Sequence, residues 1–339
     1  MRELLPDLEN WLNNGNRVAL ATVISTWGSA PRRVGSTMAV NEGGAMVGSV
    51  SGGCVEGAVV QAAREVLQTG IPKRLHFGVA DETAWGVGLA CGGEIDIYVQ
   101  PVITLLYSKL IPKIASDLPV SIATVIEGDG LGAQILFNDQ GEVLAATDSL
   151  TLDPSMRASQ PVTRKIGNEE IFVNPILPLP TLIMVGGVHI AVALAKIAQI
   201  ENFRTVIVDP RKAFGSADRF AHADKLIQAW PPAAFAEALL SSNTALASLS
   251  HDPKIDDPAL IAALKSDAFY IGALGSRKTQ KKRRARLLNA GITEERLKRL
   301  NAPIGMEIGA ETPEEIALAI MAQVVAAYRS DSALTKGTV

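Results

Sequence analysis

The pattern of apolar and polar positions divides the chain into two halves of different character. The first half opens on apolar residues that recur every three or four positions, and Gly15 is the expected end of this helix. Short runs rich in β-branched residues follow, with glycine-rich turns between them. These patterns predict a helix at residues 4–12, strands at residues 18–24, 36–40, 45–50 and 95–99, and a helix at residues 55–69.

Strand and helix patterns alternate in the second half, which is typical of a parallel sheet covered by helices. Thr312, Pro313 and Glu315 supply a capping hydroxyl, a first-turn proline and a first-turn acid, so the last helix is expected to start there. The predicted strands lie at residues 181–185, 205–209, 226–229, 245–249 and 268–271, with helices ending at residue 200, at 232–240, 258–266 and 277–290, and from residue 313.

A proline-rich segment separates the halves. Pro175, Pro178 and Pro180 are expected to block both a helix and a sheet ladder. The overall fold class is therefore α/β, with an N-terminal α+β domain followed by a C-terminal Rossmann-like parallel α/β domain. The predicted domains are residues 1–174 and 181–330, with a linker at residues 175–180 and a C-terminal tail at residues 331–339.

The first half contains an internal repeat. Residues 18–50 and 120–144 both hold an ATVI strand, a second strand, an Asn-acidic-x-Gly turn and a third strand. The repeat predicts a duplicated β-hairpin unit, with convergence of two hairpins as the alternative. The second copy lacks the SAPRR and SGGC segments, so we expect these loops to serve chemistry rather than architecture.

Composition removes several functional classes. With 47% hydrophobic and 20% charged residues in 339, the chain is expected to fold into large cores. Its net charge of −3 argues against a general binder of nucleic acid or anionic membranes. Two cysteines exclude a disulfide scaffold and fall short of the ligands of an iron–sulfur cluster. The longest apolar stretch, residues 181–195, is too short to span a membrane, and we expect a cytoplasmic protein.

Both cysteines lie among glycines. Cys54 follows Ser51, Gly52 and Gly53 at the start of a predicted helix, where oriented N–H groups favour a thiolate and lower its pKa. Cys91 precedes Gly92 and Gly93, just before a predicted strand. A lone cysteine is usually a small buried hydrophobe, but two beside bare backbone favour ligand binding or sulfur handling. Neither has the spacing of a zinc site, so no metal ligands are predicted.

A second candidate site lies in the Rossmann-like half. Gly186 and Gly187 follow a strand as in a dinucleotide fingerprint, and Asp209 stands where a ribose-binding acid belongs. Val188 replaces the second glycine and would obstruct the phosphate. A nucleotide site built from Gly186, Gly187, His189 and Asp209 therefore stays open beside a Rossmann-like sheet with no such site.

Other polar groups are expected at carboxyl ends of strands or in exposed loops. Gly275, Ser276 and Arg277 open a helix and suit an anion, and His251 follows a neighbouring strand. The basic run at residues 278–286 is interpreted as a solvated helix face. Arg32 and Arg33, in the loop GSAPRR, could hold an anion or form a surface salt bridge.

Several motifs recur together over nearly the whole chain. They are GSAPRRVGSTMAV, GSVSGGCVEG, GLACGGEIDIYVQP, TLIMVGGVHIA, VIVDPRKAFGSADRF, YIGALGSRK and APIGMEIGAETPEEIA. In this order they resemble the XdhC/CoxF (CoxI) family, the accessory maturation factors of xanthine and carbon monoxide dehydrogenases. SGGCVE with CGGEIDI is the specific pair, whereas Val188 departs from the family's usual G-x-G-H.

The resemblance implies a chaperone that binds molybdenum cofactor (molybdopterin), protects it during sulfuration and passes it to a xanthine or carbon monoxide dehydrogenase-type molybdenum hydroxylase. A cysteine desulfurase is a further expected partner, and a homodimer is expected. The predicted cofactor contacts are Ser51, Gly52, Gly53 and Cys54, then Cys91, Gly92 and Gly93, with Arg32, His251, Gly275, Ser276 and Arg277.

The alternative function is an NAD(P)-dependent oxidoreductase that uses the Rossmann-like domain. It would need a general acid or base near the nicotinamide, and His189 and His251 are the candidates near strand ends. Val188 argues against this alternative, and it leaves the two cysteine loops without a role. The sequence therefore favours a non-enzymatic maturation factor.

Overall fold

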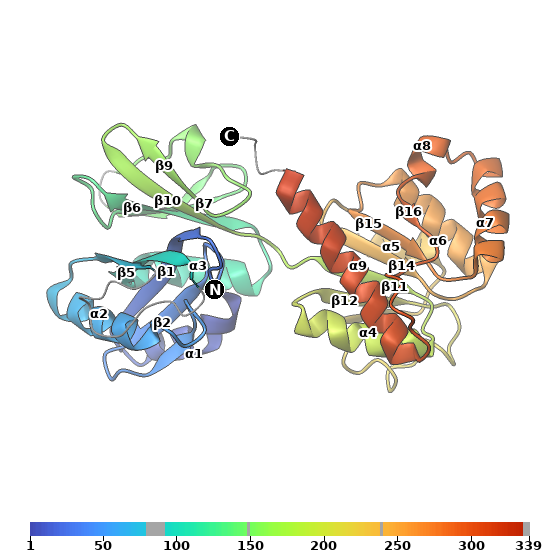
Figure 1. Cartoon of the computed structure of the whole chain (residues 1–339), viewed down its shortest axis with the longest axis horizontal. Coiled ribbons are helices and arrows are strands. Elements are labelled where there is room, and N and C mark those ends of the chain that lie inside the picture. The colour runs from blue at the N-terminus through green and yellow to red at the C-terminus, as the bar shows by residue number, and fades with distance from the viewer. Residues whose placement is uncertain (79–91, 148–149, 238–239, 335–339) are drawn as a thin grey trace. The chain divides into compact units, whose positions relative to one another are not determined.

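The computed structural model describes residues 1–78, 92–147, 150–237 and 240–334. The chain divides into two compact units, Met1–Pro178 and Leu179–Val339, which we describe separately as the N-terminal and C-terminal units (Figure 1). Among the described residues, no helix combines the length and the apolar character that crossing a membrane requires.

The N-terminal unit contains two antiparallel sheets with the same strand order. The first sheet has the order β3-β2-β1-β5-β4 and the second has the order β8-β7-β6-β10-β9. Its helices are α1 (Leu5–Asn13), α2 (Glu56–Thr69) and α3 (Thr104–Ala115). The first sheet comprises β1 (Val18–Trp27), β2 (Thr37–Asn41), β3 (Met46–Gly48), β4 (Lys73–Phe77) and β5 (Glu94–Pro101). The second comprises β6 (Val120–Glu127), β7 (Gln134–Asn138), β8 (Val143–Ala146), β9 (Val162–Ile166) and β10 (Glu169–Ile176).

The predicted repeat is confirmed, and it is larger than the sequence indicated. It covers all five strands of each sheet, and a helix precedes each copy, α1 before β1 and α3 before β6. The inner faces of the two sheets meet in a buried cluster of Ile24, Tyr98, Ile126 and Phe172. Helix α2 covers the outer face of the first sheet, where its apolar side packs on residues such as Val23. The second copy has no helix corresponding to α2 in its described residues.

The last strand before the proline-rich segment extends further along the chain than predicted. Strand β10 continues through Pro175, which lies opposite Ser121 of β6, and it ends at Ile176. The expectation that Pro175 blocks the ladder was therefore wrong. The neighbouring strand β9 pairs with β10 only as far as Val173, so Pro175 lies where β10 has one partner strand, a position that tolerates proline.

The C-terminal unit is a parallel sheet with helices on both faces. Its strands are β11 (Thr181–Val185), β12 (Arg204–Val208), β13 (Lys225–Ile227), β14 (Thr244–Ser248), β15 (Tyr270–Ala273) and β16 (Leu300–Asn301). Their order, β13-β12-β11-β14-β15-β16, is that of a Rossmann-like sheet, which confirms the predicted fold class. The helices are α4 (His189–Ile200), α5 (Pro231–Glu237), α6 (Pro253–Lys265), α7 (Arg277–Asn289), α8 (Glu294–Leu297) and α9 (Pro313–Leu334).

Helices α6 and α9 differ from the sequence prediction by several residues. Helix α6 begins at Pro253 rather than at Pro258, because Asp252 caps it by accepting a hydrogen bond from the Lys254 N–H at 2.9 Å. Helix α9 continues to Leu334, so the predicted tail from residue 331 overlaps its last turn. Helices α4 and α9 pack on one face of the sheet, and α6 and α7 pack on the other (Figure 1).

Candidate functional site

Strand direction brings three of the predicted segments to one edge of the first sheet. Strands β1, β3 and β4 run in one direction, and β5 runs in the opposite direction. The carboxyl ends of β1 and β3 therefore lie at the same edge as the amino end of β5. We call this the Cys54 edge. It carries the loop at residues 28–36 with Arg32, the loop at residues 49–55 with Cys54, and Gly92 and Gly93.

Gly93 provides contact between two of these loops. A Cβ atom at Gly93 would lie 2.8 Å from the carbonyl carbon of Ser29 and 2.9 Å from the N atom of Ala30. The missing side chain thus lets the GSAPRR loop pack directly on the start of β5. Arg32 in that loop is exposed to solvent. Gly92 has a φ of +72°, which favours glycine for conformational reasons.

Cys54 is a free, exposed thiol on the loop between β3 and α2. Gly52 and Gly53 have φ values of +82° and +120°, so the turn that presents the thiol depends on glycine. Helix α2 begins at Glu56 with Val55 as its N-cap residue, one residue later than predicted. The thiol therefore lies just before the helix, outside its first turn.

The carboxylate of Glu56 lies at the centre of the Cys54 loop. It accepts hydrogen bonds from two serine hydroxyls, Ser49 at 2.7 Å and Ser51 at 2.5 Å. Backbone N–H groups of four consecutive residues also donate to it, those of Val50 at 3.3 Å, Ser51 at 2.9 Å, Gly52 at 3.0 Å and Gly53 at 2.8 Å. The hydroxyl of Ser51 in turn accepts the Val55 N–H at 3.0 Å.

These hydrogen bonds keep Glu56 ionised. Burial acts to raise the pKa of its carboxyl group, but donation by Ser51, Ser49 and the loop backbone outweighs burial and lowers the pKa to about 2. All of these donors belong to the Cys54 loop, so the side chain of Glu56 binds the loop itself.

A charged cluster that the sequence analysis did not single out lies on β4 and β5. His76 Nδ1 is 2.7 Å from Asp96, and Arg74 donates to Asp96 at 2.9 Å and to Glu170 of the second sheet at 2.9 Å. Burial acts to raise the pKa of Asp96, but the bonds from Arg74 and His76 lower it overall. Alternation along β4 could have placed Arg74 and His76 on one face, but their partners follow only from the strand register.

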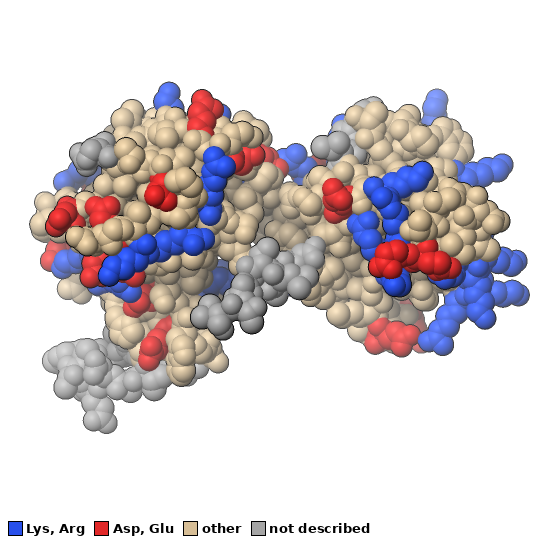
Figure 2. Space-filling model, turned by 90° about the horizontal axis from the view of Figure 1, so that it is seen from above, with Lys and Arg blue, Asp and Glu red and all other residues tan. Residues whose placement is uncertain are grey.

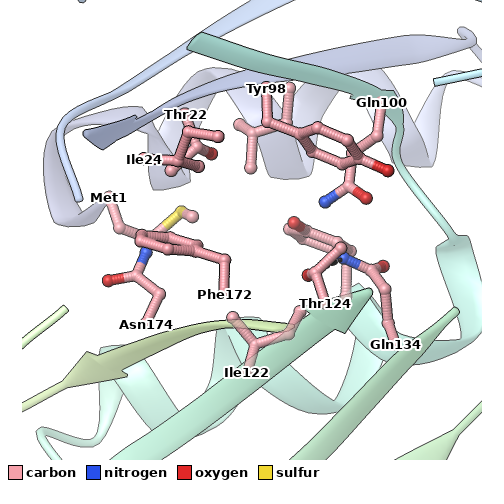
Figure 3. Close-up of a pocket in the computed structure, with 12 residues that line it drawn as sticks. Met1, Thr22, Ile24, Tyr98, Gln100, Ile122, Thr124, Gln134, Phe172 and Asn174 are labelled. Carbon is pink, nitrogen blue, oxygen red and sulfur yellow. Dashed lines mark hydrogen bonds between the residues drawn. The ribbon is translucent and has the colours of Figure 1, made fainter. Parts of the chain in front are cut away.

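A small cavity lies between the two sheets. Figure 3 shows Thr22, Tyr98 and Gln100 of the first sheet facing residues of the second, including Thr124 and Asn174. Its free volume of about 20 Å³ admits roughly one water molecule, far less than a pterin needs. This cavity is therefore not the cofactor site.

In the C-terminal unit, the space beside Gly186 and Gly187 is occupied by other residues of this chain. A Cβ atom at Gly187 would lie 2.4 Å from the carbonyl oxygen of Phe214, and one at Gly186 would lie 2.8 Å from the Cα atom of Ser250. Both glycines thus permit close approach of this chain's own backbone. In a dinucleotide site the corresponding space admits the pyrophosphate.

Asp209 is fully buried and already has partners. Its carboxylate accepts the Gly187 N–H at 2.7 Å, the Arg211 N–H at 2.9 Å and the Arg211 guanidinium at 2.7 and 2.9 Å. Burial acts to raise its pKa, but the bonds from Arg211 and Gly187 outweigh burial and lower the pKa overall. The predicted ribose-binding acid is therefore occupied by its own neighbours, while His189 is exposed at the start of α4.

The remaining predicted residues lie at the carboxyl end of the same parallel sheet. His251 follows β14, is exposed and has a φ of +62°. Gly275 follows β15 with a φ of +135°, and Ser276 caps α7 by accepting the Thr279 N–H at 3.3 Å. Arg277 is 85% exposed and forms an ion pair with Glu307 at 3.3 Å.

Helix α7 is only partly the solvated basic face that the sequence suggested. Figure 2 shows Lys and Arg side chains projecting from the C-terminal unit, and Lys278, Lys281 and Lys282 of α7 are exposed. Arg283, in the middle of the run, is buried and forms an ion pair with Asp256 at 3.1 Å. The expectation of a fully solvated run was wrong at this residue.

Comparison with known proteins assigns the family. Residues 11–78 match the model described as the XdhC and CoxI family, and residues 182–324 match the XdhC Rossmann domain. The chain belongs to the XdhC and CoxI family. Its N-terminal match contains the whole Cys54 loop, and its C-terminal match contains the parallel sheet.

Relatives extend this family assignment over most of the chain. A protein of Bacillus subtilis (strain 168), named as a probable xanthine dehydrogenase subunit, is 28% identical over 94% of this chain and 95% of its own length. The molybdenum cofactor insertion chaperone PaoD of Escherichia coli (strain K12) is 28% identical over 92% and 84%. A crystal structure of a protein described as a xanthine dehydrogenase from Bacillus halodurans has a TM-score of 0.79 at 26% identity, with 96% of both chains covered.

Cys91 lies outside the described residues, so its predicted role as a cofactor contact stays a prediction. In the parts of the chain that the structure does describe, no group of three His, Cys, Asp or Glu side chains is placed to hold a metal ion.

Proposed function

We propose that this chain is a molybdenum-cofactor chaperone, which binds the cofactor at the Cys54 edge, protects it during sulfuration and delivers it to a xanthine dehydrogenase-type molybdenum hydroxylase. The observation that carries the proposal is the exposed Cys54 thiol. It lies on a glycine loop whose backbone N–H groups donate hydrogen bonds to the Glu56 carboxylate. The name of the PaoD relative supports the cofactor, and the names of the dehydrogenase relatives support the partner.

The residues at the Cys54 edge suit the chemistry of this cofactor. The molybdenum of this cofactor is bound by the dithiolene sulfurs of molybdopterin, and a cysteine thiolate is a further sulfur donor that could bind to the metal. The exposed guanidinium groups of Arg32 and Arg33 suit the terminal phosphate, which a planar fork can bind through two hydrogen bonds. The bound cofactor supplies the redox chemistry of the recipient enzyme, whereas the residues of this chain bind it and release it.

The test is co-elution of ligand with purified protein. We expect the chain to retain molybdenum cofactor through gel filtration and to retain neither NADH nor NADPH. Loss of Arg32 and Arg33 together, as Arg32→Ala with Arg33→Ala, should weaken retention because the phosphate loses charged partners. Retention of a nicotinamide nucleotide but not of the cofactor would reverse the proposal.

An NAD(P)-dependent oxidoreductase is the second candidate, favoured by the Rossmann-like strand order. The contacts in the glycine loop disfavour it, because the Phe214 carbonyl fills the space beside Gly187 and Arg211 saturates Asp209. Titration with NADH decides between the candidates, and micromolar binding would support the oxidoreductase.

The proposal includes where the chaperone acts and with which partners. We propose that it acts in the cytoplasm as a homodimer and receives sulfur for the cofactor from a cysteine desulfurase. His251, Gly275, Ser276 and Arg277 remain proposed cofactor-binding residues within the C-terminal unit, where Ser276 caps helix α7, Arg277 is its first residue, and both suit an anionic group.

A further inference from the structure

The tip of the Cys54 loop is shaped by a charge rather than by apolar packing. Val50 and Val55, at its two ends, are fully buried. Between them, Gly52 and Gly53 have open space where a side chain would be, since no described atom lies within 4 Å of a Cβ built at either position. In the described contacts, the backbone of this segment is therefore fixed by its hydrogen bonds to Glu56, with one more from the Gly52 N–H to the Ser49 hydroxyl at 2.9 Å.

Successive N–H groups that converge on one point form a nest for an anion. In this loop the converging groups belong to Val50, Ser51, Gly52 and Gly53, and the anion is the chain's own carboxylate at Glu56. In the described part of the chain, the charge of Glu56 is stabilised by N–H and O–H groups and by no ion pair. An anion in this position cannot be removed without leaving several donors unpaired.

We propose that Glu56 is a positioning residue for Cys54: its carboxylate is the built-in anion of the loop and sets the direction in which the thiol is presented. The statement that this thiol binds the molybdenum cofactor rests on the proposed function. The statement that Glu56 fixes the loop is independent of the proposed function. A consequence is that the loop's N–H groups are not available to the phosphate of the cofactor, which has to be bound by other residues.

The C-terminal unit contains a related carboxylate, Asp256, whose charge is neutralised by an arginine. Asp256 accepts hydrogen bonds from the hydroxyls of Ser248 at 2.7 Å and Ser250 at 2.6 Å, as Glu56 does from Ser49 and Ser51. There the buried Arg283 pairs with the carboxylate. Asp256 accepts one backbone N–H, that of Ser250 at 3.3 Å, whereas Glu56 accepts four, so the charge of Glu56 is coupled more directly to the geometry of its loop.

The experiment measures hydrogen–deuterium exchange at the amides of Ser51, Gly52 and Gly53. In Glu56→Gln and Glu56→Ala, we expect exchange about tenfold or more faster, the worth of one hydrogen bond to a charged group. The matched control is Glu65→Gln on the same helix, since Glu65 is half-exposed and pairs only with Lys73 at 2.5 Å in the described contacts. Circular dichroism checks that each variant is folded.

Acetate provides a readout that a purely structural residue would not give. Added acetate should restore part of the protection in Glu56→Ala, because it can enter the vacated nest. It should restore none in Glu56→Gln, whose amide still fills the space. Unchanged exchange in Glu56→Gln overturns the proposal, and so does a folded Glu56→Ala that acetate does not protect. If Glu56→Ala does not fold, the Glu56→Gln result decides.

Cofactor retention tests the second half of the proposal. If the unmodified chain retains molybdenum cofactor, Glu56→Gln is expected to keep about a tenth or less, with Glu65→Gln unaffected. Equal retention by Glu56→Gln would overturn the positioning role. If the unmodified chain retains no cofactor, the proposed function fails, while amide exchange still decides whether Glu56 fixes the loop.

Discussion

At the residue scale, the site depends on one carboxylate whose role differs between sequence and structure. The sequence locates Cys54 and its glycines, and there Glu56 is only a negative charge at the start of a helix. In the structure its side chain turns back under the loop and accepts six hydrogen bonds. Side-chain direction at a helix start is not visible in residue spacing. The available signal was a Ser-x-Ser pair followed by an acid five positions after Ser51.

The low pKa of Glu56 predicts a pH dependence of stability. Its folded pKa of about 2 lies below the usual 4.5, so its stabilisation is fully present above pH 4.5 and is lost as pH falls through 2. Urea denaturation of the unmodified chain and of Glu56→Gln should differ by on the order of 2 kcal/mol at pH 7. The difference should shrink as pH falls below 4.5, and a constant difference down to pH 3 would contradict this pKa.

Gly93 at the Cys54 edge and Gly57 of helix α2 are expected to respond to alanine in opposite ways. Gly93→Ala would push a Cβ against the backbone of Ser29 and Ala30, so we expect a loss of about 1–3 kcal/mol in unfolding free energy. Gly57 lies in the first turn of α2 with open space beside it, and Gly57→Ala should stabilise by about 0.5–1 kcal/mol. Thermal or urea denaturation compares them, and a neutral Gly93→Ala would refute the close packing.

At the scale of elements, helices and strands with a regular apolar period could be predicted from the sequence. The pairing of strands and of side chains far apart in the sequence could not. The ATVI strands and Asn-containing turns revealed the hairpins of the repeat. Strands β4 and β9, which complete the two sheets, carry no shared motif and were not predicted as part of the repeat. The same limit hid Arg283, because a basic run gives no sign that one member turns inward to pair with Asp256.

Because Arg283 and Asp256 form a buried ion pair, replacing Arg283 should lower the free energy of unfolding far more than replacing its exposed neighbour Arg284. Arg283→Met leaves the carboxylate of Asp256 buried without its cation, and we expect a loss of about 3–5 kcal/mol in unfolding free energy. Arg284→Met is the matched control, since Arg284 and its partner Glu294 are both more than half exposed, and it should cost under about 1 kcal/mol. Similar losses in the two variants, measured by urea denaturation, would contradict the buried pair.

At the scale of the whole molecule, the sequence predicted the fold class of each unit, and the C-terminal unit shows why fold does not settle function. Its strand order is the one that binds dinucleotides in other proteins. The segment that covers Gly187, around Phe214, follows no helix or strand period, so its position could not be predicted from the sequence. The proposed function is therefore inferred from the Cys54 edge and not from the fold of the C-terminal unit.

We propose that Cys54 holds the molybdenum cofactor. The most direct measurement is the molybdenum and pterin content of the protein after it is loaded with cofactor and passed through gel filtration. We predict about one cofactor per chain for the unmodified protein and for the neighbouring control Gly57→Ala, and a several-fold loss for Cys54→Ser because the soft sulfur ligand is gone. Full retention by Cys54→Ser, with its fold intact by circular dichroism, would contradict the account.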